Sequence, residues 1–181
     1  DKLLERLRLA KYFSYQTDLP KSEIERNLLS QLDKNTAFGE STEAFSSSTK
    51  IYKGNVEEEY FTFRRKRVFL NPFSGLTQTK GLINEQSPNK ELNTVWFRIT
   101  PRVGPLATLL IAPVILTILV VNALTTELET ESLKTLVTVC AVGVILESLY
   151  YLILKQMVTF QKNEIEKNTG FLINKTGHNT K

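Results

Sequence analysis

The chain has 181 residues, of which 41% are hydrophobic and 23% charged, and 23 basic against 19 acidic residues give a net charge of +4. The single cysteine, Cys140, excludes an internal disulfide and a zinc site built from cysteines. The single histidine, His178, excludes the HExxH motif and the paired Cys-His or Ser-His catalytic groups. The average composition suits one globular domain, but the apolar residues are concentrated in two blocks near the C-terminus.

The first fifty residues show a helical pattern, a strand pattern and then a second helix. Residues 1–11 combine leucines and charged residues in an amphipathic helical pattern. This pattern predicts a short terminal helix that either covers the domain core or lies on anionic lipid. The aromatic segment of residues 12–17 favours a strand. A helix is then expected to begin near Pro20, with one apolar stripe formed by Ile24, Leu28 and Leu32.

From residue 50 the apolar period changes to two, which is typical of strands. We predict four strands, at residues 50–56, 60–70, 76–84 and 92–100. In the last strand Val95, Phe97 and Ile99 share one face, while Trp96 and Arg98 share the other. The short connections favour an antiparallel meander, so residues 1–101 are predicted to form an α+β domain of order β-α-β-β-β-β with one packed helix.

Two apolar blocks of 22 residues follow, at residues 103–124 and 133–154. As helices, each would be about 33 Å long, enough to cross a hydrocarbon core of roughly 30 Å. The alternative is a buried hairpin in a soluble protein, but a domain of this size would have little else with which to cover two such helices. The sequence therefore predicts that residues 102–155 form a transmembrane helical hairpin.

The charges that flank the hairpin predict its orientation. The loop between the blocks carries three glutamates and no lysine or arginine, whereas cations stand at the other ends, at Arg98, Arg102, Lys155, Lys162 and Lys167. The positive-inside rule then keeps both termini in the cytoplasm, with the hairpin in the bacterial inner (cytoplasmic) membrane. Residues 156–181 are predicted to be a cytoplasmic tail that continues as helix to about Lys167.

One stripe of the second block contains an ionisable residue. Cys140, Gly143, Glu147 and Tyr150 recur at spacings of three and four, so they share one helix face. A charged residue at mid-helix costs about 2.5–3.5 kcal/mol on insertion scales. Three interpretations remain open for Glu147: contact with a partner subunit, proton or ion handling, or a carboxyl group that is protonated or reaches the interface.

A second group of residues is suited to contact lipid headgroups. Amphipathic rings and cations are favoured at membrane interfaces, and anionic lipid attracts clustered cations. The alternative for the cationic run is a solvated strand end; nucleic acid is not expected, because an acidic turn precedes the run and no binding motif is present. The residues predicted to contact headgroups are Trp96, Arg98 and Arg102 before the hairpin and the run Arg64, Arg65, Lys66 and Arg67.

The sequence contains no Walker, GxGxxG, GxSxG or EF-hand motif. We therefore predict no catalytic, cofactor-binding or metal-binding residue, no cofactor and no enzymatic activity.

The chain resembles a group of small bacterial membrane proteins. The likeness rests on layout: a strand, a helix that begins at Leu19-Pro20, short strands that end in VWFRITP at residues 95–101, and two apolar spans. The group consists of uncharacterised two-span inner-membrane proteins with an N-terminal cytoplasmic α+β domain. The resemblance implies this architecture and no particular activity.

Together these features predict a non-enzymatic accessory or scaffolding subunit of a larger inner-membrane complex, which docks through its hairpin and its cytoplasmic domain. The alternative is a stand-alone anchored domain that holds a lipid or small ligand between its helix and its sheet. A homo-oligomer is compatible with either.

Overall fold

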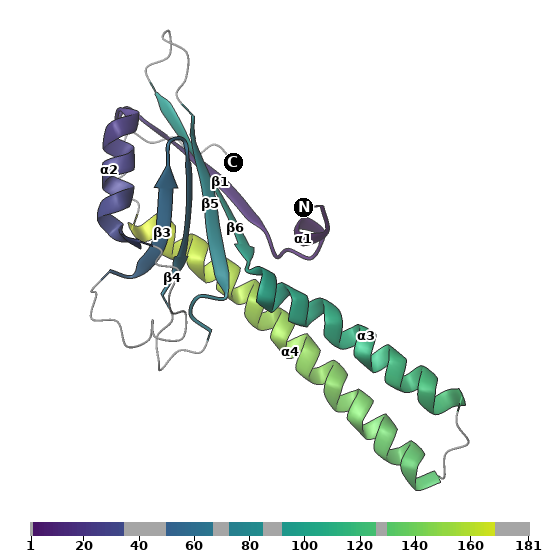
Figure 1. The fold of residues 1–181 in the computed structure, drawn as a ribbon. Coiled ribbons are helices and arrows are strands. Elements are labelled where there is room, and N and C mark those ends of the chain that lie inside the picture. Colours follow the sequence, from purple (N-terminus) through teal and green to yellow (C-terminus); the bar gives the residue numbers. More distant parts are fainter. Residues whose placement is uncertain (1, 35–49, 67–72, 85–91, 126–129, 169–181) are drawn as a thin grey trace. The chain divides into compact units, whose positions relative to one another are not determined.

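The computed structural model describes residues 2–34, 50–66, 73–84, 92–125 and 130–168 (Figure 1). The chain divides into two compact units, one formed by Asp1–Pro101 with Met157–Lys181 and the other by Arg102–Gln156. The elements are α1 (Lys2–Arg6), β1 (Lys11–Thr17), α2 (Lys21–Gln31), β2 (Leu32–Lys34), β3 (Tyr52–Glu57), β4 (Tyr60–Arg65), β5 (Thr77–Asn84), β6 (Asn93–Pro101), α3 (Val103–Thr125) and α4 (Thr130–Asn168).

The first unit contains a six-stranded sheet of order β1-β6-β5-β4-β3-β2. All neighbouring strands are antiparallel except β2 and β3, which are parallel. The predicted α+β class is confirmed, but the sheet is mixed and not wholly antiparallel. Strand β2 was missed because it has three residues and because Leu32, its first residue, continues the apolar stripe of α2.

One face of the sheet carries the core. Phe61 pairs with Gly81, Gly81 with Phe97 and Phe97 with Phe13, so these four positions lie in one row across the sheet. The row needs a glycine, because a Cβ on Gly81 would lie 1.9 Å from Cζ of Phe61. The predicted division of β6 is confirmed, since Val95, Phe97 and Ile99 are buried while Trp96 is half-exposed.

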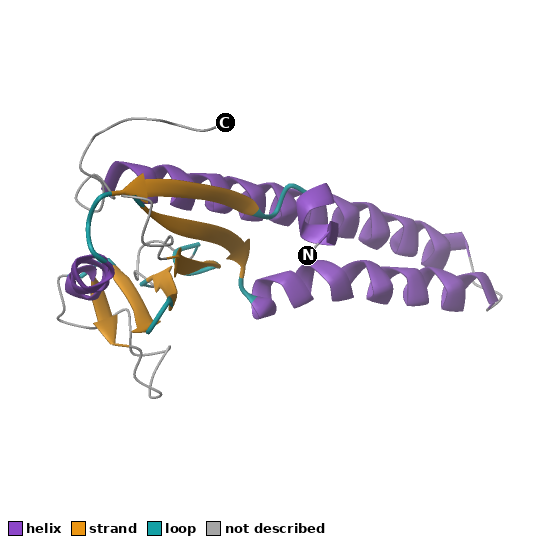
Figure 2. Ribbon diagram, turned by 90° about the horizontal axis from the view of Figure 1, so that it is seen from above, coloured by secondary structure: helices purple, strands orange, loops and turns teal. Residues whose placement is uncertain are grey.

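Two helices complete this core (Figure 2). Ile24 and Leu28 come from α2, and Val158 and Ile165 come from the last turns of α4. The prediction had one packed helix and a separate tail from residue 156. The tail is helical as predicted, but its described part to Asn168 belongs to the domain core.

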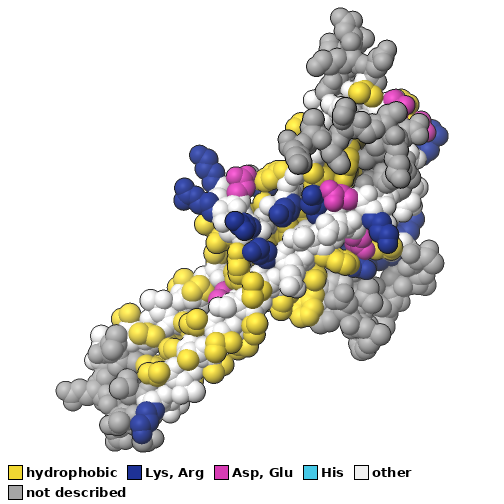
Figure 3. Space-filling view, turned by 180° about the vertical axis from the view of Figure 1, so that it is seen from behind, with side chains coloured by type: hydrophobic (Ala, Val, Ile, Leu, Met, Phe, Trp, Pro, Cys, Tyr) yellow, Lys and Arg dark blue, Asp and Glu magenta, His cyan; other side chains and the backbone are white. Residues whose placement is uncertain are grey.

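The second unit consists of α3 and the first part of α4, which lie side by side. Both helices are long and apolar enough to cross a membrane. Their side chains face outward in large numbers, in contrast to the core helices of a soluble protein, and Figure 3 shows apolar side chains along the hairpin on the face drawn. The largest exposed ones include Ile111, Val114, Ile118, Val137, Ile145 and Leu149.

Candidate functional site

The predicted stripe of α4 lies toward α3. A Cβ on Gly143 would lie 2.9 Å from Cδ2 of Leu116 in α3, so the absence of a side chain there lets the two helices approach closely. The stripe residues Cys140, Gly143, Glu147 and Tyr150 are each half-buried. The close approach that the sequence indicated at Gly143 is therefore made by the chain's own first hairpin helix.

Glu147 is a residue on this stripe whose carboxyl group lacks a hydrogen bond. Its Oε1 atom is buried and has no hydrogen-bond partner among the residues that the structure describes. Thr108, which lies at a matching depth on α3, interacts instead with the hydroxyl of Tyr150 and donates a hydrogen bond to the Gly104 carbonyl oxygen at 3.2 Å. One carboxyl oxygen thus lies inside an apolar helix pair without a donor.

In the cationic run, most of the residues predicted to contact headgroups make contacts within the domain. Arg64 and Lys66 are buried, and Lys66 forms an ion pair with Asp33. Arg65 forms an ion pair with Glu164 of α4. Arg67 lies outside the described residues. Among its described members the run therefore does not present a row of exposed cations, because Arg64 and Lys66 are buried.

The other predicted headgroup contacts lie at the end of β6 and the start of α3. Trp96 is half-exposed on the sheet face opposite the core. The guanidinium group of Arg98 lies 5.8 Å from the centroid of the Tyr12 ring, a cation–π distance. Arg102 is half-buried. Of the three, Trp96 presents the largest apolar surface.

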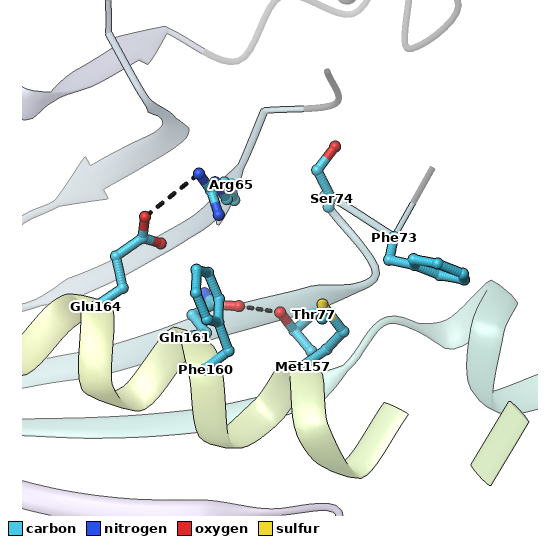
Figure 4. Close-up of a pocket in the computed structure, with 9 residues that line it drawn as sticks. Arg65, Phe73, Ser74, Thr77, Met157, Phe160, Gln161 and Glu164 are labelled. Carbon is cyan, nitrogen blue, oxygen red and sulfur yellow. Dashed lines mark hydrogen bonds and ion pairs between the residues drawn. The ribbon is translucent and has the colours of Figure 1, made fainter. Parts of the chain in front are cut away.

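A pocket lies between the last turns of α4 and the core face of the sheet (Figure 4). Its volume is about 100 Å³, against roughly 10–15 Å³ that one water molecule needs. It can therefore hold a group of several heavy atoms. The lining residues are Arg65, Phe73, Ser74, Gly75, Thr77, Met157, Phe160, Gln161 and Glu164.

Gln161 lines this pocket and joins α4 to β5 through two hydrogen bonds. Its amide nitrogen donates a hydrogen bond to Oγ1 of Thr79 at 2.6 Å, and its amide oxygen accepts one from Oγ1 of Thr77. All three side chains are buried, and buried polar groups are tolerated when each is hydrogen-bonded. The pairing sets the position of α4 along the sheet.

An ion pair closes one end of the pocket. Nη2 of Arg65 lies 3.5 Å from Oε1 of Glu164, and the guanidinium carbon lies 5.3 Å from the centroid of the Phe160 ring. The ion pair is long for a charge-assisted hydrogen bond, whose usual length is about 2.7–2.9 Å.

Two polar atoms of these residues, Nε of Arg65 and Oε2 of Glu164, are buried without a close hydrogen bond among the described residues. The hydroxyl of Tyr52 interacts with the side chains of Glu164 and Asn168. Burial, followed by the negative charge of Glu164, raises the pKa of Tyr52 above its ordinary value. The charged end of the pocket thus consists of the ion pair between Arg65 and Glu164, with Tyr52 beside Glu164.

The sequence pattern does not indicate the pocket, because Gln161 and Glu164 lie in the segment predicted to be a tail. A signal was present: Leu154, Val158, Gln161 and Ile165 recur at spacings of three and four, as on one face of a buried helix. The polar Gln161 interrupts that apolar stripe and hides it.

Comparison of the chain with protein families, curated proteins and solved structures found no match. Within the described ranges, no three His, Cys, Asp or Glu side chains come together as a group that could hold a metal ion.

Proposed function

We propose that this protein is a non-enzymatic accessory or scaffolding subunit of a larger membrane complex, and that its α3–α4 hairpin docks against a helix of that complex. The hairpin would cross the bacterial inner membrane with both termini in the cytoplasm. This orientation follows from the cations that flank the hairpin and the acidic loop between its helices.

The observation that carries the proposal is the unpartnered Oε1 atom of Glu147. A buried polar group without a hydrogen bond costs roughly 1–3 kcal/mol in proteins, and hydrocarbon offers no water to replace the missing bond. A donor on a partner helix would recover that cost. Glu147 as a whole is only half-buried, so its side chain can turn toward a neighbouring helix and bring the carboxyl group to a donor there.

The outward faces of the hairpin also support docking or lipid contact. They are apolar along both helices, with exposed Val, Ile and Leu side chains. A hairpin of two helices cannot enclose an aqueous path by itself, so transport by the isolated chain is not expected. The partner contact is thus favoured over proton or ion handling.

The test is co-purification of the Glu147→Gln variant in mild detergent. A hydrogen bond to a charged group contributes about 1.5–3 kcal/mol and a neutral one about 1 kcal/mol, so loss of the charge should weaken partner binding by roughly tenfold. The matched control is Ser148→Ala, whose hydroxyl donates to the carbonyl oxygen of Val144 in the same helix. Unchanged partners and unchanged stability in Glu147→Gln would show that Glu147 makes no such contact.

A further inference from the structure

Helix α1 does not cover the domain core, which is one of the two possibilities that the sequence leaves open for residues 1–11. No residue of α1 is buried. Leu3 is 55% exposed, and Leu4 and Leu7, which lie on the same side at helical spacing, are half-buried. The other possibility, contact with anionic lipid, is therefore the one that suits the apolar side of α1.

The C-terminal end of α1 is fixed to the domain. The amide of Arg8 donates to the Glu5 carbonyl oxygen at 2.9 Å. The amide of Leu9 donates to the Leu4 carbonyl oxygen at 2.8 Å, and Leu9 is fully buried. These two bonds form a Schellman cap, whose left-handed position is usually occupied by glycine. Here that position is Arg8, with a φ of 53°, so the cap presents an exposed cation.

The charges around α1 are mainly positive. Residues 2–8 contain Lys2, Arg6 and Arg8 against one acid, Glu5, and all four side chains are exposed. Among the residues that the structure describes, none of the three cations forms an ion pair. A helix with cations beside an apolar side matches the chemistry of an anionic membrane surface.

The register of the sheet places α1 at the end from which the chain leaves for the hairpin. Lys11, at the start of β1, pairs with Ile99, close to the end of β6 at Pro101 (Figure 1). Helix α3 begins after one further residue. Helix α4 also reaches this end, because Gln161 bonds to Thr77, which pairs with Pro101. Both connections to the hairpin therefore leave the sheet at the same end.

This end of the sheet carries further exposed apolar side chains. Ile51 directly precedes β3, and Phe73 lies in the turn before β5; they are 48% and 40% exposed. Because β4 is antiparallel to both β3 and β5, these two strands start at the same end. In the strand order, β6 lies between β1, which follows α1, and the strands β5 and β3. Exposed apolar side chains thus flank the end of β6 on both sides.

We propose that α1 and this end of the sheet rest on the anionic headgroup layer of the membrane that the hairpin crosses. The leucines of α1 and the side chain of Ile51 would enter the boundary between headgroups and acyl chains. Arg6 and Arg8 would bond to lipid phosphates. The inference rests on the proposed membrane crossing, but it does not involve the partner contact proposed for Glu147.

The experiment measures the immersion of a spin label on the full chain in vesicles, without any partner protein. A nitroxide is attached at Leu3→Cys or Ile51→Cys in a chain that also carries Cys140→Ser. Its accessibility to oxygen, which dissolves in lipid, is compared with its accessibility to a water-soluble nickel complex. The control is Ser22→Cys, because Ser22 is exposed and follows Lys21, which contacts the β3–β4 turn at the other end of the sheet. In vesicles of phosphatidylcholine and phosphatidylglycerol, we expect both test labels to be immersed and the control label to be in water.

Two variants test the cations. Arg6→Gln and Arg8→Gln should each lower the ratio of immersed to aqueous label at position 3 by about fivefold, because each removes one cation near an anionic surface. Omission of phosphatidylglycerol should lower the ratio further, since all the cations of α1 then lose their attraction. The matched control is Arg26→Gln, because Arg26 is an exposed arginine on α2. Thermal unfolding followed through Trp96 reports whether each variant is folded.

The outcomes separate this inference from the membrane crossing. Aqueous labels at positions 3 and 51 in an inserted chain would overturn the inference and leave the crossing intact. A label shielded from both reagents would show that protein covers α1, which would also overturn it. Immersion that is unchanged without phosphatidylglycerol and in both arginine variants would refute the anionic partner. A chain that alkaline carbonate strips from the vesicles would overturn the crossing, and the inference with it.

Discussion

Replacement of Ile165 by alanine tests the most consequential feature of the fold, the use of the end of α4 as a core helix. The Ile165 side chain is almost fully buried and belongs to the same core cluster as Phe61, Phe63 and Phe97 of the sheet. If α4 packs there, the substitution leaves a cavity against the sheet. If the residues from 156 onward formed a free tail instead, the substitution would leave no cavity.

The magnitude follows from burial. Replacing a buried isoleucine by alanine costs about 2–5 kcal/mol, a large part of the 5–15 kcal/mol that stabilises a typical domain. For a domain near 100 residues, 1 kcal/mol corresponds to at least about 4 °C in the melting temperature. We therefore expect Ile165→Ala to lower the melting temperature of the domain by about 8 °C or more.

The assay is thermal unfolding in detergent followed by tryptophan fluorescence. Trp96 is the single tryptophan and lies on β6, so its signal reports on the sheet and not on the hairpin. Ile145→Ala is the matched control, because it is the same substitution in the same helix at an exposed position of the hairpin. If Ile165→Ala lowers the melting temperature no more than Ile145→Ala does, the end of α4 is not part of the core.

Two further predictions concern pH and membrane orientation. Because the pKa of Tyr52 is raised in the folded chain, the unfolded chain releases this proton first, and stability should fall as the pH rises above about 10. Tyr52→Phe should lose less stability than the wild type between pH 10 and 11 in Trp96 melting curves; parallel losses would contradict the assignment. In intact cells, protease added outside should leave residues 1–101 uncut, whereas protease added after lysis should digest them; cleavage from outside would reverse the proposed orientation.

The strands of the domain could be predicted because alternation is a local signal. Each of the four strands predicted from residue 50 overlaps an observed one, and the buried and exposed sides of β6 were assigned correctly from Val95, Phe97 and Trp96. A period of two needs no knowledge of the neighbouring strand. The order of the strands does need it, so the pairing of β1 with β6 could not be derived from the pattern.

Features that depend on contacts between distant residues were missed. Arg65 belongs to a run of cations that suggests a lipid-facing surface, and only its contact with Glu164, 99 positions later, shows that it is engaged within the domain. The role of Gln161 could not be predicted either, because its hydrogen bonds go to Thr77 and Thr79, which are distant in the sequence. A polar residue gives no sign in the sequence of whether its partner is water or protein.

The use of α4 in both units also constrains the order of events during synthesis. The strands of the sheet are complete at Pro101, but Val158 and Ile165, which close the core, are added only after the 55 residues of Arg102–Gln156. The ribosome must therefore deliver both hairpin helices before the preceding domain can finish folding. A nascent chain halted inside the hairpin would carry a sheet whose apolar face is covered by α2 alone, and such exposed apolar surface makes a chain prone to aggregation.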